Sequence, residues 1–402
     1  MIAAPVDTTT VRALYVHIPF CERKCSYCDF TSVGGVQRQR PYVAALRAEL
    51  RRIAEALPGT RLDTVFIGGG TPSLIDTQLL TEILDEIRTG FTLAAGAEVT
   101  MEANPSSTTE RKAEQWLRAG VNRISLGVQS LEPDVLSFLE RVHDADRAVG
   151  AVRAVQRAGF EAVNTDLIYA APGLDDARWR STLERILDLG CTHLSCYELI
   201  VEEGTPLASA VERGEVRTAD ADTALRQHWT AVELAGRAGL RQYEISNFAR
   251  PGAECRHNLA YWHNDFYLAA GVGAHGHLPP RVADLILPSR EGAAPAGEAH
   301  AVRYWHTDSI PDYISGSHPI AGVEYVDPAD SVSESILVGL RLTEAGLPLD
   351  DRGARREAET LREAGLIEWD GRRARVTARG QELLDAVALR LVNACDGVAH
   401  AS

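Results

Sequence analysis

The strongest constraint on the fold is a repeated alternation of apolar strands and amphipathic helices over residues 13–250 of this 402-residue chain. Compact apolar runs predict six strands, and the segments between them carry apolar residues at helical spacing. The expected strands are 13–18, 63–67, 97–101, 123–127, 162–168 and 193–199. The expected helices are 40–57, 78–87, 108–119, 145–158, 176–189 and 222–238. Such alternation implies a parallel sheet covered on both faces, and we predict an α/β fold with a partial, TIM-like (βα)6 barrel.

The alternation of predicted strands and helices ends near residue 250. A single strand is expected at 242–248, and residues 255–277 are rich in His, Asn, Tyr, Trp and Gly. Prolines and glycines predict a long loop at 279–299. Near the end, Asp370-Gly371 offers the turn of a β-hairpin within a mostly helical, winged-helix-like pattern. We therefore expect a flexible N-terminus at 1–12, a barrel at 13–250, a connecting region at 251–328 and a C-terminal domain at 329–402.

Polar motifs follow the predicted strands at the same end of successive βα units. The carboxyl ends of parallel strands meet at one mouth of such a sheet, where reactive groups gather. In chain order the motifs are Cys21 to Cys28, Gly68 to Pro72, Glu102 to Pro105, Gln129-Ser130 and Asp166. Their common placement predicts a single site at this mouth.

Cys21, Cys25 and Cys28 form the most specific of these motifs. Thiolates are soft ligands that suit iron-sulfur clusters, and three of them leave one iron of a four-iron cubane open to an outside ligand. Two other interpretations stay open: three thiols on one face of a core helix, and a zinc site completed by a distant histidine. Pro19 and the polar residues between the cysteines favour a loop, so we expect a cluster cradle.

Charge and cysteine usage argue against several classes of protein. The formal net charge of -15 argues against a general nucleic-acid binder, which would show a basic face. Seven scattered cysteines do not form a dense disulfide framework, and they fit a reducing cytoplasm. The first residues lack a signal-peptide pattern, and no apolar run reaches the length that spans a bilayer. We therefore expect a soluble, cytoplasmic protein.

The motifs together resemble those of radical S-adenosylmethionine (SAM) proteins related to oxygen-independent coproporphyrinogen III oxidase, and most closely those of the HemW-type heme chaperone group. The segments that carry the resemblance are YVHIPFCERKCSYCDF, GGGTPS, MEANP, ISLGVQS, NTDLIYAAPG and HNLAYW. It implies that Cys21, Cys25 and Cys28 hold a [4Fe-4S] cluster whose fourth iron is chelated by SAM. The SAM contacts that it implies are Tyr15, Tyr27, Gly69, Gly70, Thr71, Glu102, Gln129, Arg141 and Asp166. Glycines let the backbone approach the ligand, carboxylates accept hydrogen bonds from it, and arginine pairs with a carboxylate.

Two features depart from the oxidases of this class. Those enzymes carry a further cysteine two positions after the third, where this chain has Phe30. They also carry an N-terminal extension, whereas only fourteen residues precede Tyr15 in this sequence. Both differences argue against oxidative decarboxylation of a porphyrinogen.

His257, Asn258, Tyr261 and Trp262 match the HNxxYW motif of the heme chaperones. A histidine gives heme iron an axial ligand, and aromatic faces stack on the macrocycle, so the resemblance implies a heme site at these residues. The alternative is that both aromatic residues belong to the core and that the histidine is a hydrogen-bonded loop residue. The sequence does not rank four neighbouring candidates, namely Cys255, His263, His275 and His277.

The sequence therefore predicts a heme chaperone whose cofactors are a [4Fe-4S] cluster, SAM and heme, and it assigns no catalytic residue. The implied partners are heme, an unidentified heme-acceptor protein and, if SAM is cleaved, an electron donor. No nucleic acid is expected, and peripheral membrane association through an acceptor is left open. One alternative is a radical SAM oxidoreductase like the oxidase, and a second is a non-redox zinc or partner-binding module.

Overall fold

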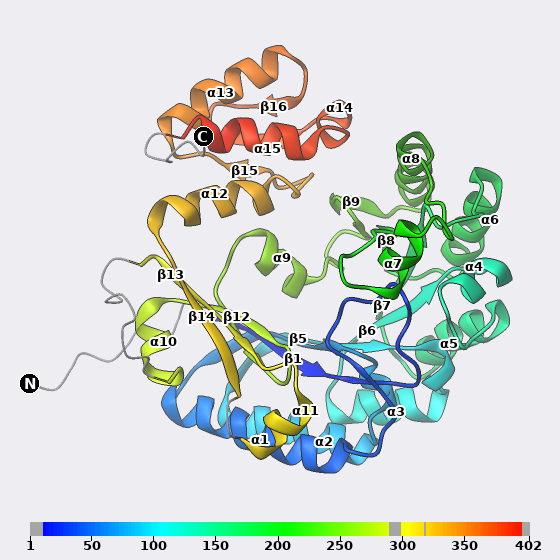
Figure 1. Ribbon diagram of the computed structural model, residues 1–402, viewed down its shortest axis with the longest axis vertical. Coiled ribbons are helices and arrows are strands. Elements are labelled where there is room, and N and C mark those ends of the chain that lie inside the picture. The colour runs from blue at the N-terminus through cyan, green and yellow to red at the C-terminus, as the bar shows by residue number, and fades with distance from the viewer. Residues whose placement is uncertain (1–10, 289–298, 317–318, 396–402) are drawn as a thin grey trace, which may run out of the picture.

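The computed structural model describes residues 11–288, 299–316 and 319–395 (Figure 1). Nearly all of the predicted flexible N-terminus, 1–12, lies outside the described residues, and so does the 289–298 part of the predicted loop at 279–299. The first part of that loop is in fact helix α10, Pro280–Ile286. Pro280 occupies the first helical position, where a proline starts a helix rather than breaking it.

The predicted parallel sheet is confirmed, and its six strands are neighbours in chain order. They are β1 Ala13–Ile18, β4 Arg61–Gly69, β5 Thr92–Ala103, β6 Arg123–Gln129, β7 Ala162–Tyr169 and β8 His193–Glu198. The helices between and after them are α1 Gln39–Ala56, α2 Thr77–Gly90, α3 Glu110–Ala119, α5 Ala145–Arg157, α6 Asp176–Leu187 and α8 Ala221–Arg237. These helices lie around the outside of the curved sheet (Figure 1). The concave face is therefore left for the polar side chains of the strands.

Side-chain caps explain why most of these helices begin where they do. The residue before the helix is an Asp or a Thr, and its side chain accepts a hydrogen bond from a backbone N–H of the first turn, which has no partner within the helix. The capping residues are Asp76 for α2, Thr109 for α3, Asp144 for α5, Asp175 for α6 and Asp220 for α8. Helix α1 is different, because Arg38 stands at its N-cap without a side-chain hydrogen bond.

The sheet extends beyond the six predicted strands at both edges, and the described residues contribute twelve strands to it. Strand β11, Tyr267–Ala270, runs parallel beside β1, and three antiparallel strands follow it. These are β12 His275–Leu278, β13 Ala301–His306 and β14 Ile320–Val326. Residues 251–328 thus add four strands to the barrel sheet, and the domain boundaries expected at 250 and 328 stay predictions.

The single strand expected at 242–248 is wrong. Two antiparallel strands stand in its place, β9 Arg241–Glu244 and β10 Asn247–Ala249. The buried carboxylate of Glu244 accepts hydrogen bonds from the backbone N–H of Ser246, at 3.1 Å, and from the side chain of Asn247. These hydrogen bonds stabilise a tight turn between the two strands. The spacing of apolar residues in the sequence does not reveal such a turn.

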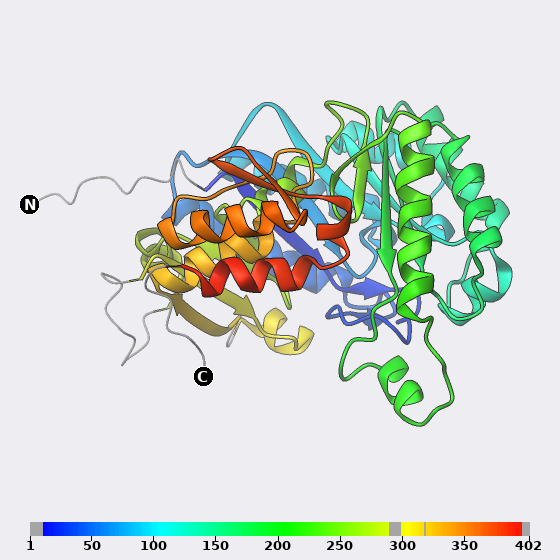
Figure 2. The ribbon, with the colours of Figure 1, turned by 90° about the horizontal axis from the view of Figure 1, so that it is seen from above.

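Shorter elements stand between these strands and helices in the chain. The strands β2 Phe20–Cys21 and β3 Val33–Gly34 form a separate pair. The helices are α4 Pro133–Phe138, α7 Pro206–Glu212, α9 Arg256–Trp262 and α11 Ile310–Ser315, with 3-10 turns at Pro72–Leu74 and Pro105–Ser107. Figure 2 shows the segment around α7 extending past the edge of the sheet.

The C-terminal residues form a module with a hydrophobic cluster of its own. Its elements are α12 Pro328–Gly339, β15 Leu347–Pro348, α13 Arg352–Glu363, β16 Ile367–Trp369, β17 Arg373–Val376, α14 Ala378–Gln381 and α15 Leu384–Asn393. The predicted hairpin is present, and the Asp370 carboxylate closes its turn by accepting from the backbone N–H of Arg372 and Arg373. No helix in the described ranges has the length and apolarity needed to cross a membrane.

Candidate functional site

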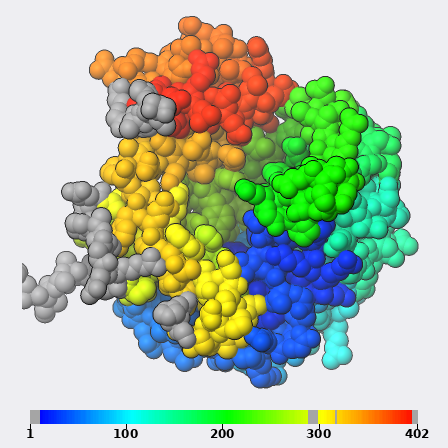
Figure 3. Space-filling view, viewed as in Figure 1, coloured from blue at the N-terminus to red at the C-terminus, as the bar shows by residue number. Residues whose placement is uncertain are grey.

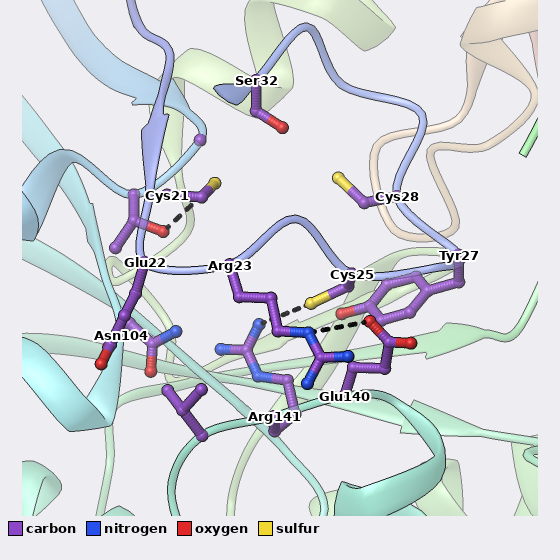
Figure 4. Close-up of a pocket in the computed structure, with 13 residues that line it drawn as sticks. Cys21, Glu22, Arg23, Cys25, Tyr27, Cys28, Ser32, Asn104, Glu140 and Arg141 are labelled. Atoms are coloured by element: carbon purple, nitrogen blue, oxygen red, sulfur yellow. Dashed lines mark hydrogen bonds and ion pairs between the residues drawn. The ribbon is translucent and has the colours of Figure 1, made fainter. Parts of the chain in front are cut away.

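The three predicted cysteines lie on one loop, residues 19–35, which we call the cysteine loop. It leaves the carboxyl end of β1, and the parallel pairing of β2 with β3 closes it. Two backbone hydrogen bonds reinforce the closure, from Val33 N to Pro19 O at 2.8 Å and from Gly35 N to Cys21 O at 2.9 Å. Figure 4 shows the side chains of Cys21, Cys25 and Cys28 facing a common cavity that they line. The interpretation as three thiols on a core helix is therefore wrong.

The three thiols line one cavity but do not converge on a single metal ion in the described structure. Within the described part of the chain, no three His, Cys, Asp or Glu side chains are close enough together to hold one metal ion. A tetrahedral zinc site needs thiolate sulfurs at about 2.3 Å from one point. Burial raises the pKa of the Cys25 and Cys28 thiols. Metal ligation opposes this shift, because it favours the thiolate.

The glycine run after β4 packs directly against the cysteine loop. The N–H of Gly70 donates to Ile18 O, and that of Thr71 donates to Phe20 O, both at 2.8 Å. A Cβ on Gly70 would lie 2.8 Å from the carbonyl carbon of Pro19 and 3.0 Å from Cys21 Sγ. Gly69 adopts φ +111°, which residues with a Cβ rarely adopt. These glycines let the two loops approach each other, and Gly70 and Thr71 line the cavity with the cysteines.

Arg141 reaches the same cavity from the turn after α4. One terminal nitrogen donates to the Gly127 carbonyl oxygen at 2.9 Å, and the other lies 3.9 Å from Cys25 Sγ. Its Nε atom is buried and has no hydrogen-bond partner among the described residues. A guanidinium nitrogen that lacks a partner beside a cavity suits an anionic ligand group. Tyr27 also lines this cavity, as Figure 4 shows.

The two predicted acids lie beside the cavity, inside the barrel. Glu102, on β5, accepts a hydrogen bond from the Gly69 N–H at 3.0 Å. Burial, and after it the charge of Asp166, raises the pKa of Glu102 to about 8. Asp166, on β7, accepts from Ser125 Oγ at 2.9 Å and from Asn164 Nδ2 at 2.7 Å, and burial raises its pKa. The Glu102 carboxyl group is thus poised to change charge when a cationic ligand approaches.

Gln129 lies at the end of β6, where the backbone is strained. Its φ of +66° is uncommon for a residue with a side chain. A Cβ on Gly127 would lie 2.9 Å from Gln129 Nε2 and 3.4 Å from a terminal nitrogen of Arg141. Gln129 and Arg141 therefore meet over Gly127, although only Arg141 lines the cavity.

Tyr15 and His17 connect the sheet to the cysteine loop. The ring of Tyr15 stacks on Phe66 with centroids 6.2 Å apart, and its hydroxyl lies 3.0 Å from His17 Nδ1. The other ring nitrogen of His17 lies 2.8 Å from the Thr31 carbonyl oxygen. Burial lowers the pKa of His17 to about 4, so that the ring is neutral. His17 was not among the predicted site residues, although residues i and i+2 of a strand share a face and Tyr15 was.

The HNxxYW motif occupies helix α9, which we call the motif helix. His257 is fully buried, with Nδ1 at 2.9 Å from Thr64 Oγ1 and Nε2 at 2.9 Å from the Tyr261 hydroxyl. Burial lowers its pKa to about 3. Glu98 accepts from the backbone N–H of both Arg256 and His257, at 3.1 Å each, and thereby holds the start of the helix. Both ring nitrogens are engaged in this conformation, so heme ligation by His257 stays a prediction that requires one of these bonds to break.

The remaining motif residues are less enclosed. Asn258 and Trp262 are half-buried, and the indole N–H of Trp262 has no partner among the described residues. The guanidinium of Arg341, from the C-terminal module, lies 5.6 Å from the Trp262 ring centroid. In Figure 3 the segment around the motif helix lies at the bottom of a hollow between the C-terminal module, the α7 segment and the cysteine loop.

The four unranked candidates lie in different surroundings. Cys255 is buried and its thiol donates to Glu98. His263 is exposed, His275 stacks on Trp305, and His277 lies 3.3 Å from the Asp265 carbonyl oxygen. Only His263 is adjacent to Trp262 in the chain.

Comparisons with known proteins agree with this geometry. The model of the radical SAM superfamily matches residues 15–186. The chain is 38% identical to "Heme chaperone HemW" of Mycobacterium tuberculosis over 94% of each chain. It is 32% identical to the mitochondrial "Radical S-adenosyl methionine domain-containing protein 1" of Bos taurus, over 97% of this chain and 89% of that protein. Among solved structures, coproporphyrinogen III oxidase (HemN) of Escherichia coli aligns with a TM-score of 0.76 at 19% identity, over 96% of this chain and 90% of the oxidase chain. That likeness shows the fold.

Proposed function

Because the chain belongs to the HemW heme chaperone family of radical SAM proteins, we propose that it binds heme and passes it to an acceptor protein. The observation that carries the cofactor part of the proposal is the cavity shared by Cys21, Cys25, Cys28 and Arg141. Three thiols that line one cavity suit an iron-sulfur cluster with one open iron, and the unpaired Nε of Arg141 suits the carboxylate of SAM.

The other predicted SAM residues suit the rest of that ligand. Glu102 and Asp166 can accept hydrogen bonds from ammonium and hydroxyl groups. Tyr15 contacts His17 through its hydroxyl, and Gln129 lies beside Arg141 over Gly127. Cys21, Cys25 and Cys28 would hold the cluster, which would supply one electron to SAM. The residues of this chain shield the ligands from water and fix their orientation.

We place heme in the hollow whose floor is the motif helix. Trp262 offers an aromatic face and an unpaired N–H, and Arg341 offers a cation for a heme propionate. In the described conformation His257 and Tyr261 hold the helix in position by their mutual hydrogen bond. Asn258, half-buried on the same helix, completes the proposed heme contacts.

The site does not favour the oxidase alternative. Phe30, which stands where the oxidases have a further cysteine, is 62% exposed at the edge of the cysteine loop. The chain therefore offers an apolar surface at that point instead of a fourth thiol. The zinc alternative is disfavoured because no three suitable side chains in the described ranges converge on one ion.

The proposed partners follow from the same chemistry. Heme is the cargo, a heme-acceptor protein receives it, and a reductant supplies the cluster if SAM is cleaved. The net charge of -15 disfavours nucleic acid. We propose that the protein works in the cytoplasm and meets a membrane only through its acceptor.

The test is anaerobic incubation of the cluster-loaded protein with coproporphyrinogen III, SAM and a chemical reductant. The proposal expects no decarboxylation, while the same preparation binds added heme. Stoichiometric formation of protoporphyrinogen would contradict it and would favour the oxidase function.

A further inference from the structure

One buried hydroxyl group in the cofactor cavity lacks a partner. Ser32 belongs to the cysteine loop and lines the cavity together with Cys21, Cys25 and Cys28. Its Oγ atom is buried and has no hydrogen-bond partner among the described residues. Figure 4 shows the Ser32 side chain pointing into the cavity, on the side where Cys21 and Cys28 also lie. A buried hydroxyl without a partner is unfavourable, so this position indicates an acceptor that the loaded cavity supplies.

The fold holds Ser32 in place from both sides. The carbonyl oxygen of Thr31 lies 2.8 Å from His17 Nε2, and the hydroxyl of Thr31 donates to Asp308 Oδ1 at 2.5 Å. On the other side, strand β3 begins at Val33 and pairs with β2. The backbone around Ser32 is therefore fixed at both neighbouring residues, and the direction of its side chain does not depend on a bound ligand.

Two of the three cysteine sulfurs already have side-chain donors. Thr71 Oγ1 donates to Cys21 Sγ at 3.7 Å. A terminal nitrogen of Arg141 donates to Cys25 Sγ at 3.9 Å. Hydrogen bonds to the sulfurs are one of the means by which a protein sets the reduction potential of an iron-sulfur cluster. The cavity thus contains such donors before Ser32 is considered.

The third sulfur receives a hydrogen bond from the loop backbone. Burial raises the pKa of the Cys28 thiol, and a backbone hydrogen bond from Phe30 opposes that rise. Ser32 is therefore not needed as a donor to a cysteine sulfur, and the inorganic sulfides of a [4Fe-4S] cluster are the remaining sulfur acceptors. Arg141, which suits the SAM carboxylate, lies across the cavity from Ser32 in Figure 4. This placement favours the cluster over SAM as the acceptor.

We propose that the Ser32 hydroxyl donates a hydrogen bond to a sulfide of the bound [4Fe-4S] cluster and thereby raises its reduction potential. The reduced cluster carries one more negative charge than the oxidised cluster, and charged acceptors form stronger hydrogen bonds. The bond therefore stabilises the reduced form more than the oxidised form. The proposal rests on the cluster part of the proposed function and is independent of heme binding and of SAM cleavage.

Potentiometric titration of the reconstituted cluster, followed by electron paramagnetic resonance without SAM, tests the proposal. Ser32→Thr and Ser32→Val form a matched pair, because the two new side chains have nearly the same shape and only threonine has a hydroxyl. The control is Ser26→Ala, on the same loop but not among the residues that line the cavity. At a given potential we expect the ratio of reduced to oxidised cluster to be about tenfold lower in Ser32→Val, a shift of about 59 mV for one electron. Ser32→Thr and Ser26→Ala should titrate as wild type does.

Electron-nuclear double resonance of the reduced cluster, in water and in heavy water, supplies a second readout. Wild type and Ser32→Thr should show a coupling to an exchangeable proton that Ser32→Val lacks. Equal potentials of Ser32→Thr and Ser32→Val would overturn the inference, and so would a loss confined to SAM affinity, because the hydroxyl would then serve SAM.

The wild type alone also tests the inference. If its reduced cluster showed no exchangeable coupling, the inference would be overturned even if Ser32→Val held no cluster. Iron and sulfide analysis identifies a failure of the proposed function separately, because a wild type that assembles no cluster would contradict the cluster site itself.

Discussion

Replacing His257 with alanine tests whether the first residue of the HNxxYW motif stabilises the fold or acts only as a heme ligand. In the structure the imidazole is fully buried and bonded to Thr64 and Tyr261 through its two nitrogens. It also packs on Phe66, with ring centroids 5.2 Å apart. These contacts join the motif helix to β4 inside the barrel, so the main effect of its removal should be on stability.

The magnitude follows from these contacts. Removing a large buried ring and leaving a cavity costs about 3–5 kcal/mol, and an unpaired buried hydroxyl costs about 1–3 kcal/mol. The terms are not additive, because the site relaxes, so we expect His257→Ala to lose about 3–5 kcal/mol of unfolding free energy. His257→Gln should lose less, because its amide can still donate to one hydroxyl and accept from the other.

Urea unfolding of the three proteins, followed by circular dichroism, measures the difference. His263→Ala is the matched control, since His263 is exposed at the C-cap of the motif helix and should change stability by less than about 0.5 kcal/mol. The reasoning is refuted if His257→Ala unfolds with wild-type stability and loses only its heme spectrum, because the histidine would then be a free ligand.

Three further predictions concern the cofactor cavity. Replacing any one of Cys21, Cys25 and Cys28 by Ser should abolish the visible absorbance of the reconstituted cluster. The control Cys191→Ala, in the barrel core, should retain that absorbance. If one of the three Ser variants retains it, that thiol is not a cluster ligand. Gly70→Ala should weaken cluster retention and SAM binding, because its Cβ would lie 3.0 Å from Cys21 Sγ, while Gly34→Ala, with no atom within 4 Å, should behave as wild type. Calorimetry should show SAM affinity rising with pH up to about pH 8, by at most about tenfold per unit, because the pKa of Glu102 is about 8 and the SAM ammonium favours its carboxylate. Glu102→Gln should flatten that slope, and an unchanged slope would assign the proton to another group.

The parallel barrel could be predicted from sequence because each of its strands is a compact apolar run between amphipathic helices. The predicted strand 13–18 coincides with β1, and the polar motifs do gather at the carboxyl ends of the strands. The edge strands β12 to β14 were missed, since they follow a segment of mixed polarity and β13 lies beyond the predicted loop. The turn between β9 and β10 depends on one carboxylate, Glu244, and leaves no break in the apolar pattern.

In the site, too, local sequence motifs could be predicted, whereas contacts between residues far apart in the sequence could not. The spacing of the three cysteines and the glycine run are local patterns, so the sequence alone was enough to assign them. The burial of His257 could not be assigned in this way, because it depends on Thr64 and Glu98, which lie far away in the sequence on β4 and β5. The role of His17 likewise depends on its contact with Thr31 across the cysteine loop.

The central claim is that this chain binds heme as a cargo in addition to its cluster and SAM. Titration of the anaerobic, cluster-loaded protein with heme, followed by the Soret band, tests it most directly. The account predicts a saturable Soret change that Trp262→Ala weakens and that leaves the cluster absorbance intact. A linear, unsaturable increase that is the same in both proteins would contradict it.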